Sequence, residues 1–543
     1  MKQISMVKAV LKIAVISVTG LLVACSSSSD SSDSGVVSTT GYVVAAPVNG
    51  ASVLVKDSTG INTIAGPVTT ASDGGYTLDP GSARSGTFIL ESSGGTYTDE
   101  ASGDQNVNAG MLKAYVDGAT LAVGSQMHLT PASTIVHGMV VNHGVGFSEA
   151  LKKFKDTFGF DADSAVAPAD ATNPAADATT EELLAGLRAA AFSQLTKDLG
   201  LAPSEQFDLL KALAEDLAFG DLDGEGDAGV DIPVTANVML PVDIHNRFSQ
   251  ALVNFHQDFD EDTNDNTGLT SDQIGTVPFA KVALTSAYKI VYKPGMMDAM
   301  EGKTMFKLLI TDHNDQPASG SGLDFTLMPM MHMAGHKHST PMLDCVEIGI
   351  TGEYDCTVYY LMSSMMGYWD LKVDLDGSMM TTTDIAHFYP TVMMPMGDTA
   401  KVTLKGVEDT ITNMDGLTVS RSYPIFKESL MGSPGLYNFS VFVAAQETMM
   451  SFPAVFVNSM LSGNALVNVI VEISADDGAS WILATDGGNG IWSVTGLTLT
   501  DGVADEIRVR LTVNDGTVDE MKTTNGLLRE VDVNDYQIFT VTP

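Results

Sequence analysis

Residues 301–333 have the sequence EGKTMFKLLITDHNDQPASGSGLDFTLMPMMHM, in which two strand-like runs flank a turn. The turn is residues 312–317, where Asp, Asn and Pro favour a reversal of the chain. The same composition of strands and turns continues through residues 278–400 and 401–543, and neither region has the apolar spacing of a helix. We therefore expect each of these two regions to form a β-sandwich.

Residues 41–102 alternate apolar and polar side chains between Gly, Asn and Asp turns, which predicts a further small β-sandwich. The runs APVNGASVLVKDSTG (46–60) and TTASDGGYTL (69–78) resemble the transthyretin-like or carboxypeptidase regulatory-like module. This resemblance implies a spacer of the kind found in surface proteins, and it implies no chemistry.

Residues 103–257 change to helical spacing. Thr179 and Glu182 have the capping-box pattern ahead of an apolar run, and Gly200 with Pro203 marks the end of that helix. We expect a multidomain, mainly β protein, with Ig-like or transthyretin-like β-sandwiches and one inserted α-helical domain. Histidines in this region lack ligand spacing and are interpreted as surface or hydrogen-bonded core residues; they are His128, His137, His143, His245 and His256.

The first 24 residues have the features of an export signal. Lys2, Lys8 and Lys12 precede an apolar run over residues 13–24, which is short for a membrane span. The run ends in LVAC (22–25), which resembles the lipobox of bacterial lipoproteins. The resemblance implies that residues 1–24 are removed and that Cys25 carries the lipid. The alternative interpretation is a short buried helix.

Residues 25–40 are rich in Ser and Asp, which predicts a flexible tether between the lipid and the folded domains. Ser26 after the cysteine resembles the pattern of lipoproteins that are sent to the outer membrane. We therefore expect an outer-membrane location, with the domains facing the periplasm or the cell exterior.

The formal net charge is -39, which argues against nucleic acid as a partner because both would be negatively charged. Such a chain is expected to bind cations, although surface carboxylates can also serve only to keep a protein soluble. Apart from Cys25, the cysteines are Cys345 and Cys356, which are close in sequence. Outside the cytoplasm their expected state is a disulfide.

Residues 258–272, DFDEDTNDNTGLTSD, alternate the carboxylate and amide side chains that Ca²⁺ prefers. The segment departs from an EF-hand loop in either possible frame. A loop that starts at Asp260 has Asp265 in place of the turn glycine. A loop that starts at Asp262 has Thr267 there, and its twelfth residue is Gln273 instead of Glu. These departures favour a solvated acidic linker over residues 258–277, with calcium binding as the alternative.

Methionine is concentrated between residues 291 and 400, which hold 17 of the 29 methionines and five of the ten histidines. On an extended strand, Met328, Met330 and His332 would face one side, and Met331 and Met333 the other. Met362, Met365 and Met366 form another cluster. The further candidate metal ligands in this region are His336, His338, Met393, Met394 and Met396.

Neutral, soft thioether sulfur suits Cu(I) or Ag(I), and imidazole also accepts Cu(II). Outside the cytoplasm, free cysteines are oxidised or form disulfides, whereas methionine keeps a sulfur atom that can bind metal. Runs of methionine beside Pro, Gly and His are unlike ordinary core positions. The sequence therefore favours a copper site over the alternative, a methionine-rich surface that binds a protein partner.

Residues 285–375 resemble the YtkA-like and FixH-like periplasmic β-sandwich domains, which are related in shape to CopC-like copper carriers. The resemblance rests on residues 301–333 quoted above and on GITGEYDCTVYYLMSSMMGYWDLKVDL (349–375). It implies copper handling, with Met328, Met330, Met331, His332 and Met333 on the methionine-rich strand. The inserted His336-Lys337-His338 segment and the two cysteines depart from the family pattern, so the ligand set and the oxidation state stay open.

We therefore expect a membrane-anchored, extracytoplasmic protein that binds Cu(I) or Ag(I) and passes the metal to a protein partner. The alternative is an interaction or adhesion lipoprotein. No G-x-S-x-G, H-E-x-x-H or C-x-x-C-H motif is found, so the sequence predicts no enzyme.

Overall fold

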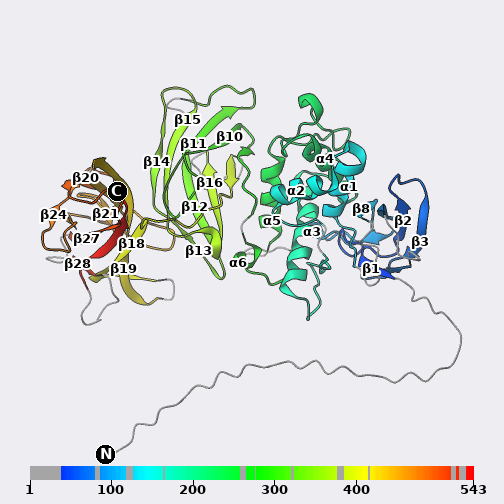
Figure 1. The fold of residues 1–543 in the computed structure, drawn as a ribbon, viewed down its shortest axis with the longest axis horizontal. Helices are drawn as coiled ribbons and strands as arrows, with labels where there is room; N and C mark the ends of the chain where they lie inside the picture. The colour runs from blue at the N-terminus through cyan, green and yellow to red at the C-terminus, as the bar shows by residue number, and fades with distance from the viewer. Residues whose placement is uncertain are drawn as a thin grey trace, which may run out of the picture. The chain divides into compact units, whose positions relative to one another are not determined.

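The computed structural model describes residues 38–543, apart from 80–85, 118–125, 163–164, 257–263, 276, 320–322, 324, 376–383, 414–415, 434, 515–520 and 525–533. The predicted signal peptide, Cys25 and nearly all of the tether lie outside the described residues. The chain is mainly β, with antiparallel sheets on both sides of a helical region in the sequence (Figure 1). None of the helices in the described ranges has the length and apolar character needed to cross a bilayer.

The first β-region has a four-stranded sheet in the order β3-β2-β5-β8. Val53 and Val55 on β2 are buried, because alternate side chains of a strand face the core. The sheet includes β8, so this β-region extends past residue 102, where the sequence placed its end. The strands are β1 (Thr39–Tyr42), β2 (Ser52–Asp57), β3 (Thr63–Thr69), β4 (Gly75–Leu78), β5 (Thr87–Ser93), β6 (Thr96–Tyr97), β7 (Val107–Asn108) and β8 (Leu112–Asp117).

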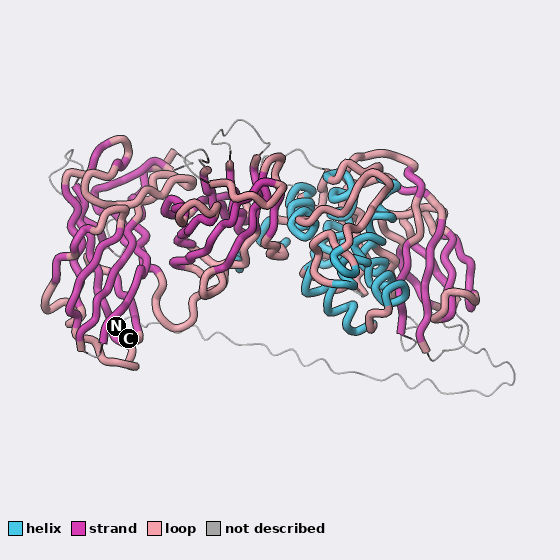
Figure 2. The backbone as a smooth tube through the Cα atoms, turned by 90° about the horizontal axis from the view of Figure 1, so that it is seen from above, coloured by secondary structure: helices cyan, strands magenta, loops and turns pink. Residues whose placement is uncertain are grey.

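The α-helices of the described residues lie between residues 131 and 274 (Figure 2). The capping box predicted at Thr179 is confirmed, since its hydroxyl accepts from the Glu182 amide and Glu182 accepts from the Thr179 amide. One hydrophobic core contains Val53 and Leu90 of the β-region together with Ile135 and Phe192 of the helices. The helices are α1 (Pro131–His143), α2 (Phe147–Phe158), α3 (Thr180–Asp198), α4 (Gln206–Phe219), α5 (Ile244–Phe255) and α6 (Ser271–Ile274).

The acidic segment is packed against the helical region from residue 264 onward. Leu269, Ile274 and Val277 are buried in the shared core, and the side chain of Asp265 is also buried. The prediction of a solvated linker is therefore wrong for this part, because apolar residues between the acidic ones anchor it. Residues 257–263 lie outside the described residues.

The methionine-rich region forms a sandwich of two antiparallel sheets, in the orders β14-β15-β11-β10-β9 and β13-β12-β16-β17. Their facing sides enclose a core that contains Ile290, Leu308, Val358 and Trp369. The strands are β9 (Val282–Leu284), β10 (Tyr288–Pro294), β11 (Gly302–Asp312), β12 (Thr326–Met333), β13 (His336–Ser339), β14 (Met342–Glu347), β15 (Glu353–Tyr360), β16 (Gly367–Asp374) and β17 (Ile385–Phe388).

The C-terminal region has antiparallel strands around a separate core that includes Tyr423, Phe439, Trp492 and Phe539. Its strands are β18 (Lys401–Thr412), β19 (Thr418–Ser433), β20 (Leu436–Val443), β21 (Met460–Leu461), β22 (Asn464–Ala465), β23 (Asn468–Ser474), β24 (Ile482–Leu483), β25 (Thr485–Asp486), β26 (Ile491–Leu497), β27 (Asp505–Asn514), β28 (Met521–Thr524) and β29 (Gln537–Val541).

A disulfide joins Cys345 on β14 to Cys356 on β15, with a Cα–Cα distance of 4.3 Å. The bond spans a bulge, since Leu343 pairs with Thr357 and Val346 with Asp355.

Replacing both cysteines by alanine is expected to lower the free energy of unfolding by about 2–3 kcal/mol, because the unfolded chain loses its cross-link. Denaturant unfolding without reductant measures the change. Parent protein in reductant should match the variant, and equal stability of parent and variant without reductant would contradict the prediction.

Candidate metal centre

The strand β12 carries the densest group of predicted ligands and divides them between two faces. Its neighbours are β13 and β16, and Met331 pairs with His338 on one side and Trp369 on the other. Leu327, Pro329 and Met331 are buried, which marks one face as the core side. Pro329 is paired with Leu371 of β16, but its carbonyl accepts from the Ser339 hydroxyl on the opposite, β13 side. The β13 ladder begins only at Met330, so the missing N–H of Pro329 breaks no bond of that ladder.

Met331 is fully buried in the sandwich core, and Met333 packs against that core. These two positions are ordinary packing sites for a flexible apolar side chain. Their sulfur atoms are therefore set apart from Met328, Met330 and His332, which face the opposite side. The five ligands expected on β12 do not come together at one point.

On the opposite face, His332 is buried and stacks on Tyr368, with ring centroids 4.7 Å apart. Its Nδ1 lies 3.3 Å from the Tyr368 hydroxyl, and its Nε2 lies 4.0 Å from a carboxylate oxygen of Asp370. Met328 and Met330 are half-buried on the same face of β12. This face therefore combines one imidazole with two thioethers.

His387 on β17 extends the polar group on this face, because its Nδ1 lies 2.9 Å from Asp370 Oδ1. Sequence reasoning missed His387, which stands alone in a strand without a nearby ligand pattern. Burial alone would lower the pKa of His387, but the negative charge and hydrogen bond of Asp370 outweigh burial and raise the pKa above its usual value.

A raised pKa in the folded state predicts a pH-dependent contribution to stability. The ion pair stabilises the fold fully below the unfolded pKa of about 6.5, and this contribution is lost as the pH rises through the higher folded pKa. The difference in unfolding free energy between the parent and His387→Gln should therefore be larger at about pH 5.5 than at about pH 8.5. Urea unfolding at both values measures it. A difference that grows toward alkaline pH would contradict the prediction.

His336 and His338 on β13 lie in different environments. His336 is exposed beside the turn, whereas His338 is buried and lies edge-on to Trp369 at 5.7 Å. His336 and His338 therefore lie in different environments, although their alternate spacing predicted that both would face the same way and could share a metal ion. Burial lowers the pKa of His338, which favours the neutral imidazole that binds metals. Its Nδ1 lies 2.7 Å from the Ser339 carbonyl, while its buried Nε2 has no hydrogen-bond partner among the residues that the structure describes.

Three segments at one end of the sandwich form what we call the methionine loops, residues 296–300, 362–366 and 393–396. Met300 and Met393 form a bridge, with the Glu301 amide donating to the Met393 carbonyl at 2.9 Å. The Ser364 amide donates to the Val392 carbonyl at 2.8 Å, and the Val392 amide donates to the Ser364 hydroxyl. These backbone bonds bring together methionines that are nearly 100 residues apart in sequence.

The methionine loops present their thioethers to solvent. Apolar side chains of this size are usually buried. Exposed methionines that are concentrated at one loop surface therefore indicate a binding or interaction site. The exposed members are Met296, Met297, Met365, Met366, Met393, Met394 and Met396, with exposures from 50% at Met393 to 104% at Met296.

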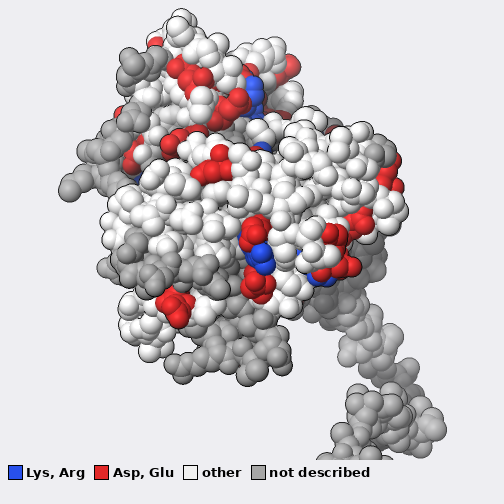
Figure 3. All heavy atoms as spheres, turned by 90° about the vertical axis from the view of Figure 1, so that its left-hand side faces the viewer, with Lys and Arg blue, Asp and Glu red and all other residues white. Residues whose placement is uncertain are grey.

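Within the described ranges, no three His, Cys, Asp or Glu side chains are arranged to hold a metal ion. A metal in the methionine-rich region would therefore depend on thioether sulfur, which selects soft ions. Acidic residues recur on the molecular surface and outnumber basic ones (Figure 3). Their charge attracts cations of any kind, so it offers no selectivity.

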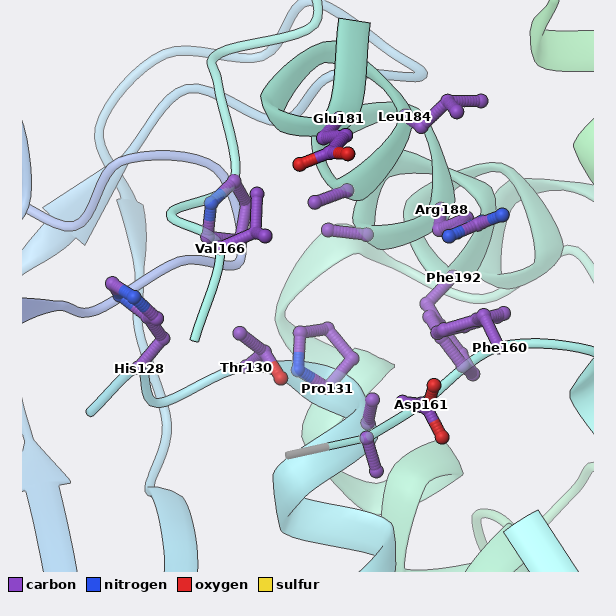
Figure 4. Close-up of a pocket in the computed structure, with 15 residues that line it drawn as sticks. His128, Thr130, Pro131, Phe160, Asp161, Val166, Glu181, Leu184, Arg188 and Phe192 are labelled. Atoms are coloured by element: carbon purple, nitrogen blue, oxygen red, sulfur yellow. The ribbon is translucent and has the colours of Figure 1, made fainter. Parts of the chain in front are cut away.

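A pocket of about 200 Å³ lies in the helical region, away from all of the predicted ligands. His128 and Val166 line one side, and Phe160 and Arg188 line the other, with the start of α1 between them (Figure 4). Its walls are largely apolar, and it contains no sulfur ligand. We do not connect it with the methionine loops.

No family model and no curated protein matches this chain. Among solved structures, domains A168–A170 of titin match at 8% identity and a TM-score of 0.12, over 47% of this chain and 99% of the titin fragment. A pullulanase from Anoxybacillus sp. LM18-11 matches at 8% identity and a TM-score of 0.11, over 48% of this chain and 27% of its own. Likeness at this level carries no argument about function. The resemblances to the YtkA-like, FixH-like and carboxypeptidase regulatory-like modules stay predictions.

Proposed function

We propose that this protein is an extracytoplasmic lipoprotein that binds Cu(I) or Ag(I) through thioether sulfur at the methionine loops. The observation that carries the proposal is the set of seven methionines exposed at three loops that backbone hydrogen bonds hold together. Soft monovalent ions prefer such neutral sulfur ligands. Exposed ligands on loops can also exchange a metal with a partner directly.

The arrangement suits capture and transfer better than permanent storage. Ligands at the surface can be replaced one at a time by those of an incoming protein, so the metal can leave without unfolding the sandwich. Thioether sulfur has no proton to lose in this range, so Cu(I) binding at the loops should vary little between about pH 5 and pH 8. Imidazole ligands such as His338 would add a component that weakens at acid pH.

The test is a titration of the full chain with Cu(I) under anaerobic conditions, in competition with a chelator of known affinity. Copper or silver bound by the parent, with Zn²⁺ and Mg²⁺ bound far more weakly, supports the proposal. Absence of Cu(I) and Ag(I) binding would overturn it. In that case the exposed methionines would be better explained as an adaptable surface for a protein partner.

A further inference from the structure

A group of buried carboxylates lies at the junction of three segments, far along the sequence from the methionine loops. Asp99, Glu100 and Asp265 have exposures of only 1–2%, and Asp170 is half-buried beside them. Carboxylates are rarely buried unless they are paired or bind a cation. In the described part of the chain, no Lys or Arg forms an ion pair with Asp99, Glu100 or Asp170.

Hydrogen bonds fasten the three segments to one another. The Asn264 side chain donates to the carbonyls of Glu100 at 2.9 Å and Ala101 at 3.1 Å. The Asn266 amide donates to the Ala171 carbonyl at 2.8 Å. The Ala171 amide in turn donates to Glu100 Oε1 at 3.4 Å, which directs the Glu100 side chain toward Asp170.

Most of the carboxylate oxygens here have protein donors. Asp99 accepts from the Ser193 hydroxyl at 2.6 Å, and Asp265 lies 3.2 Å from His256 Nδ1. Glu100 Oε2 differs, because it is buried and no residue in the described ranges donates a hydrogen bond to it.

We propose that Glu100, Asp170 and Asp265 bind a Ca²⁺ ion that joins the three segments. The available ligands are hard oxygens, and Ca²⁺ accepts six to eight of them in irregular geometry, whereas Mg²⁺ requires a near-ideal octahedron. The segment that provides Asp265 is the acidic run with alternating oxygen ligands. The site is independent of the copper proposal, because it contains no thioether.

The carboxylates surround the junction without converging on one point. A divalent cation bound among them would offset the negative charge that Glu100, Asp170 and Asp265 bring to this junction.

The test uses the full chain after treatment with EGTA. Ca²⁺ should raise the thermal midpoint of the parent more than Mg²⁺ does at the same concentration, and Tb³⁺ luminescence should report one saturable site. Glu100→Gln and Asp170→Asn should each weaken Ca²⁺ binding at least about tenfold. Without Ca²⁺, Glu100→Gln should be no less stable than the parent, because it removes a buried charge; lost binding is then not due to unfolding.

Glu149→Gln is the matched control, because Glu149 is an exposed carboxylate on α2. This variant should bind Ca²⁺ as the parent does. Equal Ca²⁺ binding by the parent, Glu100→Gln and Asp170→Asn would overturn the proposal and assign the binding to the acidic surface in general. A parent whose midpoint does not respond to Ca²⁺ would overturn it as well.

Discussion

Replacing Met365, Met366, Met393, Met394 and Met396 together by leucine is expected to lower the Cu(I) affinity of the full chain by about 100-fold or more. Leucine keeps the volume and apolar character of methionine but removes the sulfur ligand. These side chains are more exposed than buried, so the free energy of unfolding should change little, by about 0.5 kcal/mol per site or less. Competitive titration with a Cu(I) chelator measures the affinity.

The chain offers a matched control outside the methionine-rich sandwich. Five methionines elsewhere have exposures of 47–66% and can be changed to leucine in the same way: Met111, Met239, Met431, Met450 and Met460. The control variant should bind Cu(I) as tightly as the parent. If both variants lose affinity equally, binding depends on methionine content and not on the loops. If neither variant loses affinity, the loops are not the site.

His338 can be tested separately from the loops. Its buried Nε2 makes it a candidate imidazole ligand, but it also packs against Trp369. A loss of Cu(I) affinity at acid pH in the parent, absent from His338→Phe, would assign the proton-sensitive component to this residue. The thioether component should be the same in both proteins.

Local patterns predicted the type of structure well. The capping box at Thr179 marked the start of α3, because that signal depends on residues only three apart. Period-two alternation also separated the two faces of β12, and the burial of Met331 against the half-burial of Met330 follows it. Such features depend on neighbours in sequence, which one chain displays directly.

Features that depend on distant contacts were not predicted. Met300 and Met393 form their bridge only because two loops of the sandwich end side by side, and no local signal indicates this. The same reason explains the acidic segment, where charge dominated the interpretation although Leu269 and Ile274 bury it against helices. His338 was predicted as a ligand, but its burial on Trp369 could not be inferred from its spacing to His336.

Cys25→Ser is expected to transfer the protein from the membrane fraction almost entirely to the soluble fraction. The lipobox-like LVAC run implies that acyl chains on Cys25 provide the attachment, and each buried CH₂ contributes about 0.8 kcal/mol to membrane binding. A negatively charged chain gains no compensating attraction to anionic lipid headgroups. Removing the lipid should therefore remove the attachment.

Fractionation of cells that produce the parent or Cys25→Ser measures the effect, and mass spectrometry of the parent should find a lipid-modified N-terminal cysteine. The variant with Cys345 and Cys356 both changed to alanine is the control, because it keeps Cys25 and should stay with the membrane. If Cys25→Ser sediments with membranes as the parent does after a high-salt wash, Cys25 is not the anchor. The membrane attachment would then need another explanation, because residues 26–35 consist entirely of Ser, Asp and Gly and have no apolar side chains to bury in lipid.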